Sequence, residues 1–210
     1  MLVAEKVTFG YSKGTTLLDG WDARFEAGSV TAITGPSGRG KSTLLYLLGL
    51  MLTPQGGAVL LDGNDVSGLD DAARARLRAA RFGFVFQDAA LDPTRTVLEN
   101  VTESALYRGK PRHEVYPRAQ ELLTRFGVAV RATARPGEIS GGQAQRIALC
   151  RALLHSPDVV LADEPTGNLD PASADVVLDA FRGHANGGAA VVVVTHDPRV
   201  VARCDVEVKL

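Results

Sequence analysis

The stretch GPSGRGKS at residues 35–42 decides the fold of this chain. It follows residues 29–34, SVTAIT, whose β-branched side chains favour a strand. It precedes residues 43–52, TLLYLLGLML, whose unbranched leucines favour a helix until Thr53-Pro54 ends it. The stretch fits the phosphate-binding pattern G-x-x-x-x-G-K-[ST], in the strand, loop and helix order that this pattern requires. The sequence therefore predicts a nucleotide-binding loop.

Each residue type in this loop has a chemical reason. Glycines let the backbone curl, so that successive N–H groups and the helix N-terminus face the phosphates. Lys41 can reach the β and γ oxygens, and the Ser42 hydroxyl can bind Mg²⁺. The alternative, a chance glycine-rich turn, does not account for the flanking strand and helix. The predicted nucleotide contacts in this segment are Gly35, Pro36, Ser37, Gly38, Arg39, Gly40, Lys41, Ser42 and Thr43.

Two adjacent carboxylates follow the apolar run of residues 159–162. Asp163 and Glu164 would stand at the carboxyl end of a buried parallel strand, where α/β sheets bind ligands. Asp163 is placed to hold Mg²⁺ through water, and Glu164 could polarise the attacking water as a general base. The alternative is a capping pair at the start of the next helix. The phosphate-binding loop upstream favours the metal and base interpretation.

A third motif, ISGGQ at residues 139–143, opens a predicted helix over 141–155. Ser140 and the exposed amides of the glycines form a second anion site at a helix N-terminus. With this motif the chain strongly resembles the ATP-binding subunits of ABC transporters, whose signature is [LI]-S-G-G-Q. The resemblance covers essentially the whole chain and keeps the order of the family's motifs.

The resemblance implies further site residues. Tyr11 matches the aromatic residue that stacks on adenine, and Gln87 in FVFQD matches the glutamine loop between core and helical lobe. His196 in VVVVTHD matches the switch histidine that touches the γ-phosphate, and residues 168–170 match a loop that contacts a second subunit. A surface aromatic of a hairpin is the alternative for Tyr11. A capping or core histidine would be favoured for His196 if it stood alone.

The resemblance also implies hydrolysis of ATP at a dimer interface. We expect ATP and Mg²⁺ as cofactors, a homodimer or pseudo-dimer of this chain, and a separate transmembrane permease subunit as partner. The expected catalytic residues are Lys41, Gln87, Glu164 and His196; the expected Mg²⁺ ligands are Ser42, Gln87 and Asp163; and Ser140, Gly141, Gly142 and Gln143 of one subunit would contact the ATP held by the second.

Composition and charge exclude other classes of function. The 210 residues carry 23 Lys+Arg against 24 Asp+Glu, so no overall basic field exists to hold nucleic acid or anionic lipid. No apolar run is long enough to span a bilayer, and Glu5 and Lys6 stand where a secretory signal needs apolar residues. We expect a cytoplasmic chain without a nucleic-acid partner, peripheral on the inner face of the cell membrane and attached to it only through its partner.

The fold class is predicted to be α/β. Residues 159–162 and 189–194 are apolar at every position, as in parallel strands covered by helices on both faces. Residues 2–9 and 17–26 are typical of strands, separated by a turn at 10–14. The resemblance implies a P-loop NTPase fold with a RecA-like parallel-sheet core and an N-terminal antiparallel β-subdomain.

A change of pattern sets off the middle of the chain. Residues 88–157 are predominantly helical, with expected helices over 96–107, 113–126 and 141–155. We interpret this stretch as an α-helical subdomain inserted in the core. The whole of residues 1–210 then forms a single ABC ATP-binding domain.

The subfamily can be narrowed, although the cargo cannot. The strings ADEPTGNLD, GFVFQD and TVLENV resemble subunits that serve macrolide-type exporters, lipoprotein-releasing complexes and a related cell-division complex. A non-transport ATPase that drives a membrane signalling or cell-division complex remains the alternative. The related ATPases of DNA repair and chromosome structure are disfavoured, because they carry a long coiled coil or a zinc module between loop and signature, and this interval holds neither.

The interval after Gln87 is also expected to meet the membrane partner. We expect the helical lobe and Gln87 to form a groove for a short helix of that partner, with Asp88, Leu91 and Thr96 at its surface. The residues Ala89-Ala90-Leu91 differ from the commoner Leu-Leu-Pro wording of the family. Since the chain ends at Leu210, soon after His196, we expect no regulation by an appended C-terminal domain.

Overall fold

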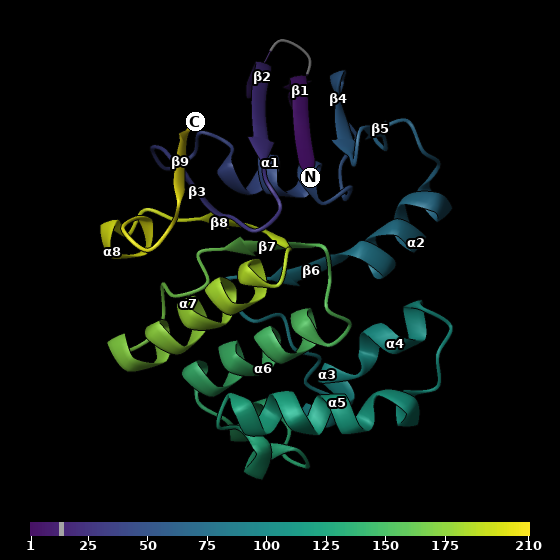
Figure 1. The fold of residues 1–210 in the computed structure, drawn as a ribbon, viewed down its shortest axis with the longest axis vertical. Helices are drawn as coiled ribbons and strands as arrows, with labels where there is room; N and C mark the ends of the chain where they lie inside the picture. Colours follow the sequence, from purple (N-terminus) through teal and green to yellow (C-terminus); the bar gives the residue numbers. More distant parts are fainter. Residues whose placement is uncertain (13–14) are drawn as a thin grey trace.

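The computed structural model describes residues 1–12 and 15–210, which form two sheets (Figure 1). The turn expected at 10–14 lies partly outside the described residues. The antiparallel sheet has the order β2-β1-β4-β5, and the sheet of order β6-β7-β8-β3-β9 is parallel. The strands are β1 Leu2–Phe9, β2 Leu18–Phe25, β3 Val30–Thr34, β4 Gly56–Leu61, β5 Asn64–Asp65, β6 Phe82–Val85, β7 Val159–Asp163, β8 Ala190–Val194 and β9 Val206–Lys209.

Helices cover both faces of the parallel sheet (Figure 1). The helices are α1 Lys41–Leu48, α2 Asp71–Arg81, α3 Val97–Val101, α4 Glu103–Tyr107, α5 Arg112–Arg125, α6 Gly141–Leu153, α7 Pro171–Asn186 and α8 Pro198–Val201, with 3-10 turns η1 Ala129–Arg131 and η2 Pro136–Glu138. In Figure 1, α1 lies between the two sheets, while α6 and α7 lie on the opposite face of the parallel sheet.

Alternate residues of each central strand enter different cores. Val159 and Leu161 of β7 pack with the leucines of α1 and the antiparallel sheet. Val160 and Ala162 pack with α6 and α7. Burial on both sides is why these strands are apolar at every position. The α/β P-loop NTPase fold predicted from the sequence, with its antiparallel N-terminal sheet, is confirmed.

One predicted helix is wrong in its extent. The helix expected over 96–107 is divided into α3 and α4 at Thr102, whose hydroxyl donates to the carbonyl of Leu98 at 2.8 Å. A threonine hydroxyl bonded to the carbonyl four residues back disturbs the helix ladder. Helix α6 packs against β6, and α3, α5 and α6 share one apolar core with the parallel sheet. The helical segment is therefore continuous with the sheet's core.

Candidate nucleotide-binding site

The sheet order brings the predicted motifs to one edge of the parallel sheet. Strands β7, β8 and β3 are neighbours and run parallel, so their carboxyl ends meet at the same edge. The glycine-rich loop follows β3, Glu164 follows β7, and His196 follows β8. This edge is where ligands bind in open α/β sheets.

The glycine-rich loop reaches α1 through a residue in the left-handed region. Gly40 is the N-cap of α1, with φ of 92°. A Cβ at this position would lie 2.7 Å from Cγ of Leu17. Gly40 therefore combines a backbone angle and a close approach that side chains do not tolerate, and it directs the N–H groups of α1 toward the loop.

Lys41 closes the loop on itself. Its Nζ donates to the carbonyls of Gly35 at 2.8 Å and Pro36 at 3.0 Å. The ammonium group is thus held within the loop by two of its carbonyls. An ammonium held in this position can turn from carbonyl to phosphate oxygens, which are stronger, charged acceptors.

Ser42, Gln87 and Asp163 lie in one cleft of about 660 Å³. Burial raises the pKa of Asp163, an effect opposed by a hydrogen bond with Ser42 and by the charge of Lys41, and reinforced by Glu164. The cleft thus holds a desolvated carboxylate that a nearby cation would stabilise. The remaining lining residues are Tyr46, Phe86, Asp88, Ala90 and Asn168.

These donors fit Mg²⁺ better than a transition metal. Ser42, Gln87 and Asp163 all offer oxygen, the donor atom that Mg²⁺ prefers. In proteins Mg²⁺ is commonly bound by one carboxylate together with phosphate oxygens. Within residues 1–12 and 15–210, no group of three or more His, Cys, Asp or Glu side chains could hold a metal ion. The site is therefore suited to a cation that arrives with a phosphate ligand.

Glu164 and His196 are directly paired. The Nδ1 of His196 lies 2.6 Å from Oε1 of Glu164, and the Thr195 hydroxyl donates to Oε2 at 3.4 Å. The Glu164 side chain is 14% exposed and that of His196 is 76% exposed. Glu164 also has φ of 44°, in the left-handed region where strain is found at functional sites. The carboxylate is therefore oriented from two sides.

Tyr11 stands beside the start of α1. Its hydroxyl shares a hydrogen bond of 3.1 Å with Oγ1 of Thr43, and its ring meets the Phe9 ring edge-on at 5.1 Å. The residue is 67% exposed. These contacts hold the aromatic ring next to the phosphate-binding loop.

The ISGGQ motif is separate from the cleft. Ser140 caps α6 by accepting from the N–H of Gln143 at 3.3 Å, and Oε1 of Gln143 accepts from the N–H of Ser140 at 3.0 Å. Gly141 borders a small hollow beside Gln87, whereas the described residues that line the Ser42 cleft include none of 140–143. A single copy of the chain does not bring this motif to its own phosphate-binding loop.

Sequence reasoning missed two residues of this site. Tyr46 lines the cleft, and burial together with Asp163 raises its pKa. Thr195 is fully buried and bonds Glu164. Helical spacing of four residues from Ser42 could have indicated Tyr46. The position of Thr195 directly before His196 was the corresponding signal for that residue.

Comparisons with known proteins agree with this geometry. The family model described as "ABC transporter" matches residues 18–167. The chain is 46% identical over 195 residues to "Lipoprotein-releasing system ATP-binding protein LolD" of Paramagnetospirillum magneticum, covering 92% of this chain and 86% of that protein. For the protein of the same name from Shewanella oneidensis, the identity is 43% over 209 residues, with coverage of 98% and 91%.

A solved structure also has a very similar fold. The dimeric ATP-binding cassette MJ0796, in a post-hydrolysis state bound to ADP and Pi, matches with a TM-score of 0.93 at 33% identity. The match covers 100% of this chain and 94% of that one. On the family match, these identities and the shared fold, the chain belongs to the ABC transporter family and is one of its ATP-binding domains.

Proposed function

We propose that this chain is the ATP-hydrolysing subunit of a lipoprotein-releasing transporter and works as a pair of identical copies. The chain is an ATPase of the ABC family. The cargo is inferred from relatives named for a lipoprotein-releasing system, which align over more than nine-tenths of the chain. The observation that carries the catalytic proposal is the gathering of Ser42, Gln87 and Asp163 in one cleft.

The proposed binding residues hold the nucleotide from several sides. The amides of residues 35–43 and the Lys41 ammonium contact the phosphates, and the Tyr11 ring stacks on adenine. Ser42 and Gln87 would hold Mg²⁺ directly, and Asp163 would hold it through water. A bound Mg²⁺ would supply positive charge that neutralises the phosphate oxygens. Replacing the Lys41 contacts to Gly35 and Pro36 by phosphate contacts is the rearrangement that binding requires.

The proposed base is Glu164. Its carboxylate accepts a proton from the attacking water, while His196 and Thr195 keep it oriented through the contacts described above. His196 is mostly exposed and can therefore reach the γ-phosphate from the same position. Charge that develops in the transition state would be stabilised by Lys41 and His196.

A second copy supplies the signature motif. Ser140, Gly141, Gly142 and Gln143 lie outside the cleft of their own chain, so in this proposal they contact ATP held by the other copy. The similar cassette MJ0796 is dimeric with ADP and Pi. Each copy acts as one domain over residues 1–210, with a helical subdomain at about 88–157.

The membrane partner is a separate subunit in this proposal. Among the described residues, none of the helices has both the length and the apolar character needed to cross a bilayer. We place the chain on the inner face of the cell membrane, held there by a transmembrane permease subunit. Family membership supports this arrangement, since ABC transporters move membrane subunits with ATP.

The three residues expected at the docking surface differ in their contacts. Asp88 lines the phosphate-side cleft, Leu91 packs against the core, and Thr96 caps α3 in a capping box with Glu99. Leu91 and Thr96 therefore have structural contacts of their own. The partner contact expected from the sequence at Asp88, Leu91 and Thr96 stays a prediction, and we propose that the partner's helix itself lies in an adjacent groove.

An apolar groove of about 500 Å³ lies between α2, β6, α4 and α6. Its lining includes Phe82 and Phe84 of the edge strand β6 and Phe86 just after it, whose rings stack at centroid distances of 6.1 and 6.0 Å. Met51 and Tyr107, two exposed apolar side chains, stand at its rim. A groove of this kind fits the apolar face of a short amphipathic helix.

Polar atoms in the groove indicate the chemistry of that helix. Oγ of Ser104 and Nε2 of His155 are buried and have no hydrogen-bond partner among the described residues. Burial lowers the pKa of His155 to about 4, so the imidazole is neutral at pH 7. Arg76 is exposed at the rim and makes no ion pair with any described residue. The proposed partner helix therefore carries an acidic side chain for Arg76, whereas the buried Ser104 and His155 atoms are not open to it.

Replacing Glu164 tests the catalytic proposal. Glu164→Gln should keep nucleotide binding but slow turnover by about 10²–10⁴-fold, the loss expected for a general base. Phosphate release measures turnover, and binding of a fluorescent ATP analogue measures affinity. Turnover at the parental rate in the variant would remove Glu164 from the base position.

Two alanines on α2 test the docking proposal. Ala80 lines the groove and Ala72 does not, while both are exposed. With the transmembrane subunits of a lipoprotein-releasing system co-expressed, Ala80→Glu should abolish copurification and Ala72→Glu should not. Intact ATP binding by both variants controls for folding. Equal recovery of the membrane subunits with both variants would reject this groove.

A further inference from the structure

The loop after β6 contains two consecutive left-handed residues. Ala89 has φ of 61° and Ala90 has φ of 45°, a region disfavoured for residues with a Cβ. Gln87 precedes them in the same loop, and the N–H of Ala89 donates to the carbonyl of Phe86 at 3.1 Å. Local sequence preference opposes this turn, so contacts from elsewhere in the fold must hold it.

Helix α6 supplies those contacts. Arg151 donates from Nη1 to the carbonyl of Ala90 at 2.6 Å and from Nη2 to the carbonyl of Ala89 at 2.8 Å. Nε2 of Gln145, on the same helix, donates to the carbonyl of Phe86 at 3.0 Å. A planar guanidinium grips two successive carbonyls in fixed geometry, which a lysine ammonium does not.

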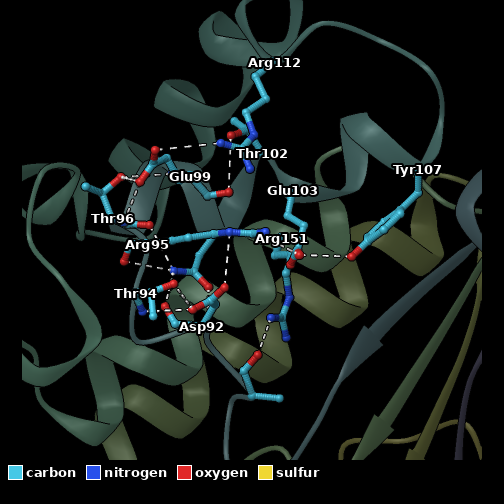
Figure 2. A network of polar contacts seen from close by, with 12 residues as sticks. Asp92, Thr94, Arg95, Thr96, Glu99, Thr102, Glu103, Tyr107, Arg112 and Arg151 are labelled. Atoms are coloured by element: carbon cyan, nitrogen blue, oxygen red, sulfur yellow. Dashed lines mark hydrogen bonds and ion pairs between the residues drawn. The ribbon is translucent and has the colours of Figure 1, made fainter.

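Arg151 lies beside a polar network centred on Glu103 (Figure 2). Burial lowers the pKa of its guanidinium, and the negative charge of Glu103 counteracts this effect. Glu103 accepts from the Tyr107 hydroxyl at 3.0 Å and pairs with Arg95, which also pairs with Asp92 at 3.2 Å. Glu103 therefore supports the arginine through its charge, while the guanidinium donates its hydrogen bonds to the loop.

We propose that Arg151 is a positioning residue for ATP hydrolysis: it holds the left-handed turn at Ala89-Ala90 so that Gln87 faces Ser42 and Asp163. The inference rests on the proposed contact of Gln87 with Mg²⁺. Because Arg151 and the Ser140 cap belong to the same helix, the turn links the cleft of one chain to the signature that this chain offers to a second copy. Ala90 and Arg151 also line the apolar groove, so a helix bound there would contact the turn itself.

Two measurements on Arg151 variants test this. In the nucleotide-free chain, Arg151→Met should speed hydrogen exchange of the Ala89 amide about tenfold relative to global unfolding, the effect of losing about 1.4 kcal/mol of local stabilisation. The Mg²⁺ concentration for half-maximal ATPase activity should rise by a similar factor, with a smaller change at saturating Mg²⁺. For Arg151→Lys, both the Ala89 exchange rate and the Mg²⁺ requirement should lie between those of the parent and of Arg151→Met, since one ammonium cannot bind both carbonyls in the same geometry.

A rescue and a matched control separate positioning from general stability. Ala90→Gly in the Arg151→Met chain should restore much of both properties, because glycine adopts left-handed angles freely. Arg146→Met removes an arginine of the same helix that bonds Phe126 and Gly142 instead of the loop, and it should leave Ala89 exchange unchanged relative to global unfolding. Thermal melts identify any variant that fails to fold, in which case Arg151→Lys carries the test.

Three outcomes are decisive. Unchanged exchange of the Ala89 amide in Arg151→Met overturns the proposal. So does faster exchange with an unchanged Mg²⁺ requirement, provided that Gln87→Ala raises that requirement. If Gln87→Ala does not raise it, the proposed Mg²⁺ contact of Gln87 fails instead. The exchange data alone then show whether Arg151 holds the turn.

Discussion

At the scale of single residues, two acidic residues of the site lower the stability of the folded chain. Asp163 is 8% exposed, and burial of its carboxylate raises its pKa more than the Ser42 hydrogen bond and the Lys41 charge lower it. Glu164 has a left-handed backbone angle that a glutamate rarely adopts. Both features oppose folding, and both place an acid at the carboxyl end of β7. Functional sites commonly keep such unfavourable features.

Asp163→Asn should therefore stabilise the nucleotide-free chain while abolishing hydrolysis. The amide carries no charge to desolvate, so the free energy of unfolding should rise by about 1 kcal/mol at pH 7. The pKa of Asp163 in the folded chain lies above its value in the unfolded chain. The folded chain therefore loses stability as the pH rises through the interval between these two values. The gain should accordingly shrink at acid pH, where the carboxyl is protonated in both states. Urea unfolding of both proteins measures it, and a less stable variant at pH 7 would contradict the desolvation argument.

The lowered pKa of His155 predicts that the free energy of unfolding falls as the pH falls, which is opposite in sign to the effect of Asp163. Burial lowers its pKa from 6.5 to about 4, so the folded chain favours the neutral imidazole. Its contribution to stability is complete above about pH 6.5 and is lost as pH falls toward 4. His155→Leu should flatten the fall in unfolding free energy within this window. Parallel curves for the two proteins between pH 7 and pH 4 would contradict it.

At the scale of elements, α1 depends on how its first turn is entered. Gly38 and Gly40 both have positive φ, of 78° and 92°, but only Gly40 also approaches Leu17 closely. The space around Gly38 is open, with no atom within 4 Å of a Cβ placed there. Substitutions at these two glycines therefore distinguish the cost of backbone strain from the cost of a steric clash.

Gly38→Ala should lower the free energy of unfolding by about 1 kcal/mol through backbone strain alone. Gly40→Ala should cost about 2–3 kcal/mol, because the new Cβ also meets the Leu17 side chain. Urea denaturation followed by circular dichroism provides both values. Equal losses would show that the Leu17 contact relaxes without cost.

At the scale of the whole molecule, the ISGGQ motif points to a second copy. The motif opens α6 beside the Gln87 loop, while the described lining of the Ser42 cleft lacks it. A Cβ added at Gly141 would meet no atom within 4 Å. An added Cβ at this position therefore meets nothing in its own chain, and we expect a longer side chain there to act on an assembled pair.

Gly141→Arg should prevent ATP-dependent dimerisation. In the Glu164→Gln background, light scattering with ATP and Mg²⁺ should report a dimer for the parent and a monomer for the variant. Gly68→Arg is the matched control, since Gly68 is exposed and has equally open surroundings, near α2. A dimer that survives Gly141→Arg would show that the motif does not lie in the interface.

Sequence alone determined the elements that local chemistry specifies. Strand β1 has the predicted limits of residues 2–9, and the apolar runs became β7 and β8, because side-chain alternation and burial are local patterns. The glycine, lysine and serine of the phosphate-binding loop were equally readable, since their spacing expresses one short backbone conformation. That Ser42 of this loop lies in one cleft with Asp163 followed from the parallel strand order that the family resemblance implied.

Only the tertiary structure decided which distant side chains meet. Glu164 pairs with His196 across 32 residues, and Arg151 reaches the carbonyls of Ala89 and Ala90 across about 60. The groove along β6, where we propose that the membrane partner docks, is likewise lined by segments far apart in the sequence. Such contacts depend on how helices pack on the sheet, which residue spacing does not encode. The left-handed turn at Ala89-Ala90 is the clearest case, because local preference opposes it and long-range hydrogen bonds hold it.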